Sequence, residues 1–335
     1  MEKLTNKDFT SDQEIRWCPG CGDYAILRAM QKALPQLEEK KEDFVFISGI
    51  GCSSRFPYYM NTYGFHTIHG RAPAFATGVK LANPKLSVWQ ITGDGDALAI
   101  GGNHFIHALR RNIDINILLF NNEIYGLTKG QFSPTSQKGI KTKSNPHGTT
   151  DDPFSVSDLA IGAQGSFFAR SVDTNPKLMQ KIFTESAQHK GTSLIEILQN
   201  CVIFNDKTFA SITDKAVKSD AQIILEDGKP MIFGAENNKG IILNGFKLKV
   251  VRLGINGITE KDILVHNAQE KDPTLHTMIA RMRPPEFPAA VGIIRKVSRS
   301  TFDEGIIKQL QKEKKNAKFQ TVDDLLQSGD TWEVK

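Results

Sequence analysis

Short, continuous runs of apolar residues recur through the first 200 residues of the chain. They are rich in β-branched and aromatic side chains, which is typical of strands that are buried on both faces of a sheet. Because they are short and have no helical period, we interpret them as strands. The runs are DFVFIS (43–48), LSVWQIT (86–92), INILLFN (115–121), GSFFARS (165–171) and SLIEILQ (193–199).

Between these runs, apolar residues recur at helical spacing in four segments, 24–37, 72–82, 101–111 and 176–190. The alternation of strand and helix predicts an α/β fold with a doubly wound, mostly parallel sheet. Sheets of this kind bind ligands at the carboxyl ends of their strands. The segments at those ends are SGIGCSS, TGDGDA, FNNEIYG and QNC.

The pattern changes in the second half of the chain. Residues 130–153 have no periodicity and many Gly, Pro, Ser and Thr residues, which predicts a long functional or mobile loop. Residues 231–253 read as strands around Asn-Gly and Asn-Lys-Gly turns, and the Lys-rich segment 303–318 reads as a solvated helix. We therefore expect a ligand-binding domain over 1–200 and a small α+β extension over 201–335.

Composition narrows the class of protein. The chain has 335 residues, is 39% hydrophobic and carries a formal charge of +5, as an ordinary globular protein does. The modest basic excess fits an acidic partner, an anionic substrate or a solvated surface. We find no apolar run of transmembrane length and no apolar signal core near the N-terminus. We therefore expect a cytoplasmic protein that binds neither membranes nor nucleic acid.

The most informative stretch is 92–128, where two predicted strands end in polar turns. The first strand ends in Gly93-Asp94-Gly95, followed by a helix, and the second ends before Asn122. Glycines allow close approach of the backbone to a phosphate, and a helix N-terminus offers free amides. Asp94, Asn122 and the Ile124 carbonyl are oxygen donors that suit Mg²⁺. The alternative is two unrelated loops, with Gly-Asp-Gly as a plain turn.

The chain has four cysteines, two of them in a tight C-x-x-C turn at Cys18 and Cys21. This spacing serves zinc clips, redox dithiols and iron–sulfur sites. Cys52 and Cys201 each follow a predicted buried strand, so they lie on the ligand side of the sheet. Four thiolates are enough for one tetrahedral ion or one cubane cluster, and structural disulfides are not expected in a reducing cytosol.

Five motifs together resemble the β subunits of 2-oxoacid:ferredoxin oxidoreductases, the 2-oxoglutarate type in particular. The resemblance runs from about Trp17 to Asp206 and weakens afterwards, although CVIFND and EFPAAVGIIRKV still fit. It implies a thiamine-diphosphate-binding fold with Mg²⁺ and one [4Fe-4S] cluster. The motifs are WCPGCG, GIGCSSR, HTIHGRAPAFATGVKLANP, GDGDALAIGGNHFIHALRRN and NNEIYGLTKGQFSPTS.

The resemblance assigns residues. Mg²⁺ would be bound by Asp94, Asn122 and the Ile124 carbonyl, and the cluster by Cys18, Cys21, Cys52 and Cys201. A cluster also explains why Cys52 lies inside the presumed cofactor loop, where a zinc clip would serve little purpose. Thiamine diphosphate would contact Ile50, Gly51, Cys52, Ser53, His69, Gly93, Gly95, Asp96, Gly126, Leu127 and Thr128.

Two residues are candidates for contact with the substrate. His69 either touches the diphosphate or the substrate, or is structural. Arg55 either pairs with the carboxylate of a 2-oxoacid or binds neighbouring loop carbonyls. His104 and His107 lie on the helix after Gly-Asp-Gly-Asp, and we expect them to be packing or surface residues.

The implied activity is reversible oxidative decarboxylation of a 2-oxoacid to acyl-CoA and CO₂, with electrons passing through the cluster to ferredoxin. The cofactor's activating glutamate would come from a separate α subunit, so we expect an active heterotetramer and an inactive single chain. A pyruvate-type β subunit, a thiamine-dependent decarboxylase or synthase without electron transfer, and a non-catalytic metal or electron-transfer protein remain alternatives.

Overall fold

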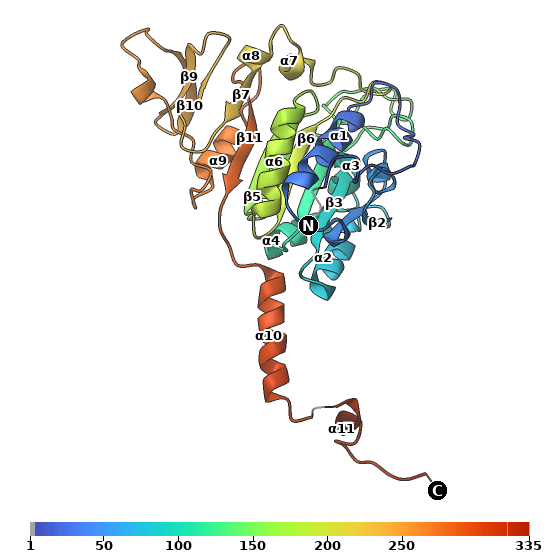
Figure 1. Cartoon of the computed structure of the whole chain (residues 1–335). Helices are drawn as coiled ribbons and strands as arrows, with labels where there is room; N and C mark the ends of the chain where they lie inside the picture. Colours follow the sequence, from blue (N-terminus) through green and yellow to red (C-terminus); the bar gives the residue numbers. More distant parts are fainter. Residues whose placement is uncertain (1–3, 320, 335) are drawn as a thin grey trace.

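The computed structural model describes residues 4–319 and 321–334 and is built around one eight-stranded sheet (Figure 1). The strand order is β2-β1-β3-β4-β6-β5-β11-β7. Among the described residues every pairing in this sheet is parallel except that of β11 with β5. The strands are β1 (Phe44–Ser48), β2 (Tyr63–His66), β3 (Ser87–Gly93), β4 (Asn116–Asn121), β5 (Phe167–Val172), β6 (Ser193–Leu198), β7 (Gln222–Leu225) and β11 (Ala289–Lys296).

The five strands predicted from the sequence are confirmed as β1, β3, β4, β5 and β6. Every residue of β1, β4, β5 and β6 is buried, which explains why their sequences are continuously apolar and do not alternate. The mostly parallel, doubly wound sheet that the sequence predicts is therefore present.

The four predicted helices are confirmed as α1 (Asp23–Ala33), α2 (Ala72–Ala82), α4 (Gly102–Arg111) and α6 (Pro176–Gln188). The first is shorter than expected. It was predicted to reach residue 37, but the α-helix ends at Ala33 and a 3-10 turn, Leu34–Gln36, follows. Pro35 lies in that turn, and proline cannot donate the backbone hydrogen bond that an α-helix interior needs.

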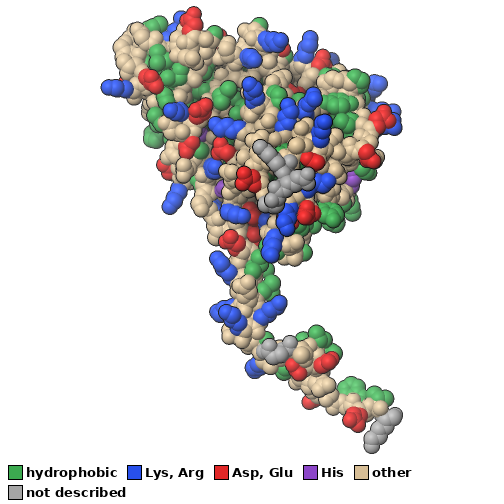
Figure 2. All heavy atoms as spheres, in the orientation of Figure 1, with side chains coloured by type: hydrophobic (Ala, Val, Ile, Leu, Met, Phe, Trp, Pro, Cys, Tyr) green, Lys and Arg blue, Asp and Glu red, His purple; other side chains and the backbone are tan. Residues whose placement is uncertain are grey.

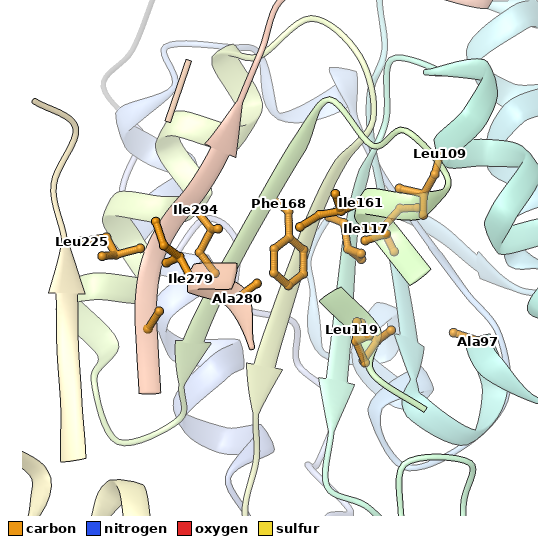
Figure 3. Close-up of a cluster of buried hydrophobic side chains, with 14 of the residues drawn as sticks. Ala97, Leu109, Ile117, Leu119, Ile161, Phe168, Leu225, Ile279, Ala280 and Ile294 are labelled. Atoms are coloured by element: carbon orange, nitrogen blue, oxygen red, sulfur yellow. The ribbon is translucent and has the colours of Figure 1, made fainter. Parts of the chain in front are cut away.

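The helices cover both faces of the sheet. The N-terminal helix α1 packs against α6 on one face, where side chains such as Phe46, Trp89 and Phe183 form a buried cluster. On the other face, α2, α4, α5 (Val156–Gly162) and α9 (Thr274–Ala280) cover a second cluster. Figure 3 shows this second cluster, in which Phe168 lies near the middle of the row of labelled side chains from Leu225 to Ala97.

The C-terminal region completes the main sheet. Although the domain division at residue 201 stays a prediction, β7 and β11 lie beyond it and pair in the same sheet as β5. The predicted strands around the Asn-Gly turn are confirmed by a separate antiparallel sheet of β8 (Ile232–Phe233), β9 (Lys239–Asn244) and β10 (Lys247–Arg252). Short helices α7 (Ala210–Thr213) and α8 (Lys218–Ala221) link β6 to β7.

Beyond β11 the chain leaves the body of the molecule as α10 (Phe302–Asn316), followed by α11 (Val322–Leu326) (Figure 1). The Lys-rich helix predicted for this segment is confirmed. Its lysines are exposed, and Figure 2 shows basic side chains along the projecting helix and apolar ones near α11. In the described part of the chain, every helix is too short or too polar to cross a bilayer.

A buried ion pair links β5 and β6 beneath the carboxyl ends of the strands. Arg170 Nε lies 2.7 Å from Glu196 Oε2, and both side chains are almost completely buried. Asn121 Nδ2 donates to the other carboxylate oxygen of Glu196 (2.9 Å). Burial raises the pKa of Glu196, but the charges of Arg170 and Arg283 and the hydrogen bonds from Asn121 and Arg170 together outweigh burial and hold the pKa below its usual value.

We expect Arg170→Met to lower the free energy of unfolding by about 3 kcal/mol at neutral pH, because it leaves the Glu196 carboxylate buried without its closest partner. In the wild type, the stabilisation from Glu196 is present above its ordinary pKa of 4.5 and is lost as the pH falls through its lower folded value. In the variant, burial dominates and protonation relieves the unpaired charge. The difference between the wild type and the variant in the free energy of unfolding, measured with denaturant, should therefore shrink as the pH falls below neutrality.

The matched control is the double variant Arg170→Met/Glu196→Gln. It removes both charges and keeps an oxygen that can accept the hydrogen bond from Asn121, so it should recover most of the lost stability. An equal deficit in the single and double variants would contradict the assignment of the loss to an unpaired charge.

Candidate functional site

A cavity of about 500 Å³ lies at the carboxyl ends of β1, β3 and β4, and we call it the cofactor cavity. Every residue predicted to bind Mg²⁺ or thiamine diphosphate lines it. The structure therefore brings together segments that are far apart in the sequence, while the roles of the individual residues stay predictions. The lining residues from the prediction are Ile50, Gly51, Cys52, Ser53, His69, Gly93, Asp94, Gly95, Asp96, Asn122, Ile124, Gly126, Leu127 and Thr128.

Asp94 begins the short helix α3 (Asp94–Leu98) at the end of β3. Its carboxylate is buried, and its Oδ2 accepts hydrogen bonds from the hydroxyls of Ser133 (2.5 Å) and Thr135 (2.6 Å). Burial raises the pKa of Asp94, and these two hydrogen bonds oppose the rise. Both hydroxyls bind the same oxygen, so Oδ1 is the oxygen that they leave for a ligand.

Asn122 and Ile124 lie in the turn after β4. The Ile124 N–H donates to Asn122 Oδ1 (3.2 Å), which holds the side-chain amide against the turn. Together with Asp94 they offer a carboxylate, an amide oxygen and a backbone carbonyl at one cavity wall. This donor set suits Mg²⁺, which takes few protein ligands and completes its shell with phosphate oxygens and water.

Asp96 holds three loops together. Its Oδ1 lies 2.6 Å from His69 Nδ1 and accepts from the N–H groups of Gly70 (2.7 Å) and Ile50 (3.0 Å). Its Oδ2 accepts from the Thr92 hydroxyl (2.7 Å). The carboxylate is therefore fully engaged inside the protein, which leaves the backbone of Asp96 for the predicted contact with a diphosphate.

The same contact orients His69. Because a carboxylate accepts hydrogen bonds, the imidazole donates through Nδ1 to Asp96, and Nε2 is left for a ligand in the cofactor cavity. The structure places His69 in the wall of the cofactor cavity, and its contact with the diphosphate or the substrate stays a prediction.

Tyr125 was missed by sequence reasoning, although it lies in the segment FNNEIYG that was singled out. Its hydroxyl donates to the Gly95 carbonyl oxygen (2.8 Å), and its ring covers the Cα atom of Gly95. Burial raises the pKa of Tyr125 to about 12, with Asp94 and Asp96 adding to the effect, so the phenol is a neutral donor.

We expect Gly95→Ala to cost about 1–3 kcal/mol in the free energy of unfolding, because its Cβ would lie 2.3 Å from Tyr125 Cε1 and force the ring away. Affinity for thiamine diphosphate should fall with it, as measured by calorimetry. Gly102→Ala is the matched control, since a Cβ there meets no atom within 4 Å. A variant Gly95→Ala with wild-type affinity and stability would show that the contact is not needed.

All four cysteines line a second cavity, of about 210 Å³, which we call the cysteine cavity. The Cys21 N–H donates to the Cys18 carbonyl oxygen (3.0 Å) in the C-x-x-C turn. A Cβ placed on Gly126 would lie 3.5 Å from Cys52 Sγ and 3.6 Å from Cys201 Sγ, so these two thiols face the same point. The four cysteines therefore line one cavity, while their joint binding of a cluster stays a prediction.

Cys18 is exposed, whereas Cys21, Cys52 and Cys201 are half-buried. Burial raises the pKa of Cys52 to about 12, with the charges of Asp23 and Cys201 adding to the rise and Arg55 opposing it. Burial also raises the pKa of Cys21. Across residues 4–319 and 321–334, no group of three or more His, Cys, Asp or Glu side chains closes on a single metal ion.

The two cavities are adjacent. They share five lining residues, Asp23, Cys52, Asn122, Gly126 and Leu127. Asp23 was not anticipated from the sequence. It is completely buried at the start of α1, and burial, its largest influence, raises its pKa to about 7.

Other predicted residues lie at the edge of the site or outside it. Arg55 lines the cysteine cavity, and its Nη1 donates to the Arg16 carbonyl oxygen (3.1 Å), which is the second of the two possibilities considered for it. His104 and His107 lie on α4 and line neither cavity. Gln131 and Phe120 also line the cofactor cavity and were missed, although both lie in segments that the sequence analysis singled out.

Comparison with known proteins agrees with this geometry. Residues 49–197 match the family model described as thiamine pyrophosphate enzyme, C-terminal TPP binding domain. The chain is 50% identical to 2-oxoglutarate oxidoreductase subunit KorB of Mycobacterium tuberculosis over 331 residues, which is 98% of this chain and 88% of that protein. It is 46% identical to 2-oxoglutarate synthase subunit KorB of Archaeoglobus fulgidus over 185 residues, 55% of this chain and 69% of that one.

A solved structure is similar over the whole fold. It is the 2-oxoglutarate:ferredoxin oxidoreductase from Magnetococcus marinus with 2-oxoglutarate, coenzyme A and succinyl-CoA bound. The match has a TM-score of 0.77 at 27% sequence identity and covers 98% of each chain. The resemblance seen in the motifs therefore extends to the fold and to nearly the full length.

Proposed function

Because the chain belongs to the family of 2-oxoglutarate oxidoreductase β subunits, we propose that it forms the thiamine-binding half of an enzyme that oxidatively decarboxylates 2-oxoglutarate to succinyl-CoA. Electrons would leave through a [4Fe-4S] cluster to a ferredoxin. The single observation that carries the proposal is the shared wall between the cofactor cavity and the cysteine cavity, where Cys52 belongs to both.

The cofactor cavity fits thiamine diphosphate with Mg²⁺. Asp94, Asn122 and the Ile124 carbonyl would bind the ion, and the loops that end at Gly95 and Gly126 would lie against the diphosphate. When bound, the thiazolium ring supplies an electron sink for the carbon–carbon bond that breaks on loss of CO₂. This chain's part is to bind and orient the cofactor and, through His69 Nε2, to offer a polar contact at the cavity wall.

The cysteine cavity fits an iron–sulfur cluster better than a zinc clip. Thiolates are the usual ligands of such clusters, and all the cysteines of the chain are gathered there. A structural zinc site would not need to share a wall with a cofactor cavity. An electron acceptor, in contrast, must lie close to the cofactor for electrons to pass between them. Cys18 is exposed at the rim, which would leave one side of the cluster accessible to an external electron carrier.

A second subunit is needed to complete the cofactor site. The side chains of Ile50 and Leu127 line the cofactor cavity, yet they are 41% and 42% exposed. Ile68 is 68% exposed, although it precedes His69 in the cavity wall. Apolar groups exposed in this way are typical of surfaces that bind protein. We propose that an α subunit covers them and supplies the glutamate that activates the cofactor, in a heterotetramer.

The choice of 2-oxoglutarate over pyruvate rests chiefly on the relatives. The names of both KorB proteins include 2-oxoglutarate, and the solved structure has 2-oxoglutarate bound. Arg55 is the candidate partner for a substrate carboxylate, although its present hydrogen bond goes to a loop carbonyl. A pyruvate-specific enzyme remains the second candidate.

The test is co-expression of the chain with its α subunit, followed by anaerobic purification and assay of several 2-oxoacids with coenzyme A and a viologen dye. We expect a brown protein that reduces the dye fastest with 2-oxoglutarate, and no activity from the β chain alone. A colourless preparation that consumes the 2-oxoacid without reducing the dye would favour a thiamine-dependent decarboxylase or synthase without electron transfer. Activity of the single chain would contradict the need for a partner.

A further inference from the structure

The turn at residues 122–126, which we call the dividing turn, separates the two cavities. Asn122 and Gly126, at its two ends, line both of them. A Cβ placed on Gly126 would lie in van der Waals contact with the Cys52 and Cys201 thiols, so this end of the dividing turn faces both of them. Any shift of the dividing turn therefore moves one wall of each cavity.

Asn205 connects the dividing turn to the segment that carries Cys201. Its backbone N–H donates to the Cys201 carbonyl oxygen (3.0 Å), and these two residues form an isolated β-bridge. Its side-chain Nδ2 donates to the Asn122 carbonyl oxygen (2.9 Å). One residue is thus hydrogen-bonded to the backbone on both sides of the shared wall.

Glu123 provides a second connection between the same segments. It is buried in the dividing turn with a left-handed backbone (φ 56°), a conformation that needs support from its surroundings. Its carboxylate accepts a hydrogen bond from Thr208 Oγ1 (3.1 Å), three residues after Asn205, and another from Gln137 Nε2 (3.1 Å). The segment after Cys201 therefore holds the dividing turn at two points.

We propose that Asn205, supported by Thr208, is a positioning residue that couples the two cavities. A divalent ion and a diphosphate that hold the dividing turn also fix the Cys201 thiol, because Asn205 transmits the order of one segment to the other. The inference rests on the proposed function, since it needs the cofactor cavity to take these ligands. Coupling of this kind requires no large movement, only a reduced range of motion in a shared wall.

The test uses the full chain assembled with its α subunit and prepared without iron. Each cysteine is alkylated with iodoacetamide and followed by mass spectrometry, with and without Mg²⁺ and thiamine diphosphate. Cys201 lines the cysteine cavity and not the cofactor cavity, so a ligand there does not cover it directly. We expect the ligands to slow alkylation of Cys201 by about 5-fold or more, the usual lower range of coupling between sites.

In Asn205→Ala and Thr208→Val, the ratio of the Cys201 alkylation rate without ligands to the rate with ligands should fall towards one, while calorimetry still detects ligand binding. Asn200→Ala is the matched control. It removes bonds to Asp206 and Lys207 in the same segment but touches neither end of the dividing turn, so its ratio should remain that of the wild type.

Two results would overturn the inference, namely unprotected Cys201 in a wild-type chain that binds the ligands, or undiminished protection in Asn205→Ala. A wild-type assembly with the α subunit in which calorimetry detects no binding would instead overturn the proposed function, and the coupling with it. The calorimetric reading therefore separates the two failures.

Discussion

Asp94→Asn should abolish Mg²⁺-dependent binding of thiamine diphosphate and, at the same time, leave the unliganded protein as stable as the wild type or more stable. The affinity should fall by more than about 100-fold, because even the outer hydrogen-bond partners of metal ligands are worth 10–100-fold. The change removes the one carboxylate of the proposed ion site but keeps the size of the side chain.

The expectation for stability follows from the pKa of Asp94. Burial raises that pKa, so the ionised carboxylate is a cost to the folded chain at neutral pH when no cation is bound. An amide removes this cost, and it can still accept hydrogen bonds from Ser133 and Thr135. Thermal unfolding without ligand and calorimetry with ligand should therefore change in opposite directions.

Asp173→Asn is the matched control. Asp173 is a second buried carboxylate whose pKa is raised chiefly by burial, but it does not line the cofactor cavity. It should alter stability and leave cofactor affinity unchanged. If Asp94→Asn bound the cofactor as tightly as the wild type, the assignment of Asp94 as an Mg²⁺ ligand would be wrong.

Cys201→Ser should remove the cluster from the assembled enzyme while thiamine diphosphate still binds. Because the chain has no spare cysteine, no other thiol can replace the lost ligand. Visible absorbance and dye reduction should disappear together in anaerobically purified protein, whereas calorimetric binding of the cofactor should persist, since Cys201 does not line the cofactor cavity.

The neighbouring substitution Val202→Ala provides the control, because Val202 lines the cysteine cavity without offering a ligand. It should keep its absorbance. Zinc in place of iron in colourless, active wild-type protein would contradict the redox assignment, and so would a Cys201→Ser variant that retains the visible spectrum.

Much of this fold could be predicted because it depends on local patterns in the sequence. Buried parallel strands have continuous apolar sequences, so β1, β3, β4, β5 and β6 could be found without any knowledge of their neighbours. The parallel arrangement then places the turns after β3 and β4 at one edge, which is why Asp94 and Asn122 could be paired from the sequence.

What could not be predicted depends on contacts between distant segments. Ser133 and Thr135 lie in a stretch without periodicity, and nothing local shows that their hydroxyls turn back onto Asp94. The cofactor contact of Asp96 stays a prediction, and nothing local shows that its carboxylate joins three loops. Likewise, EFPAAVGIIRKV fitted the family, yet its place beside β5 is set by packing across more than one hundred residues of chain.

The position of β11 has a consequence for the order in which the protein can form. This strand lies between β5 and β7 although it comes from 289–296, so it is among the last parts of the body to leave the ribosome. Until β11 has been made, β5 is an edge strand of the nascent chain, although all its residues are buried in the finished fold. The backbone amides and carbonyls on its open side are unpaired, and such an edge is prone to association with other chains. Translation that stops before residue 289 would therefore yield a fragment that contains nearly all the ligand-binding residues and still tends to aggregate.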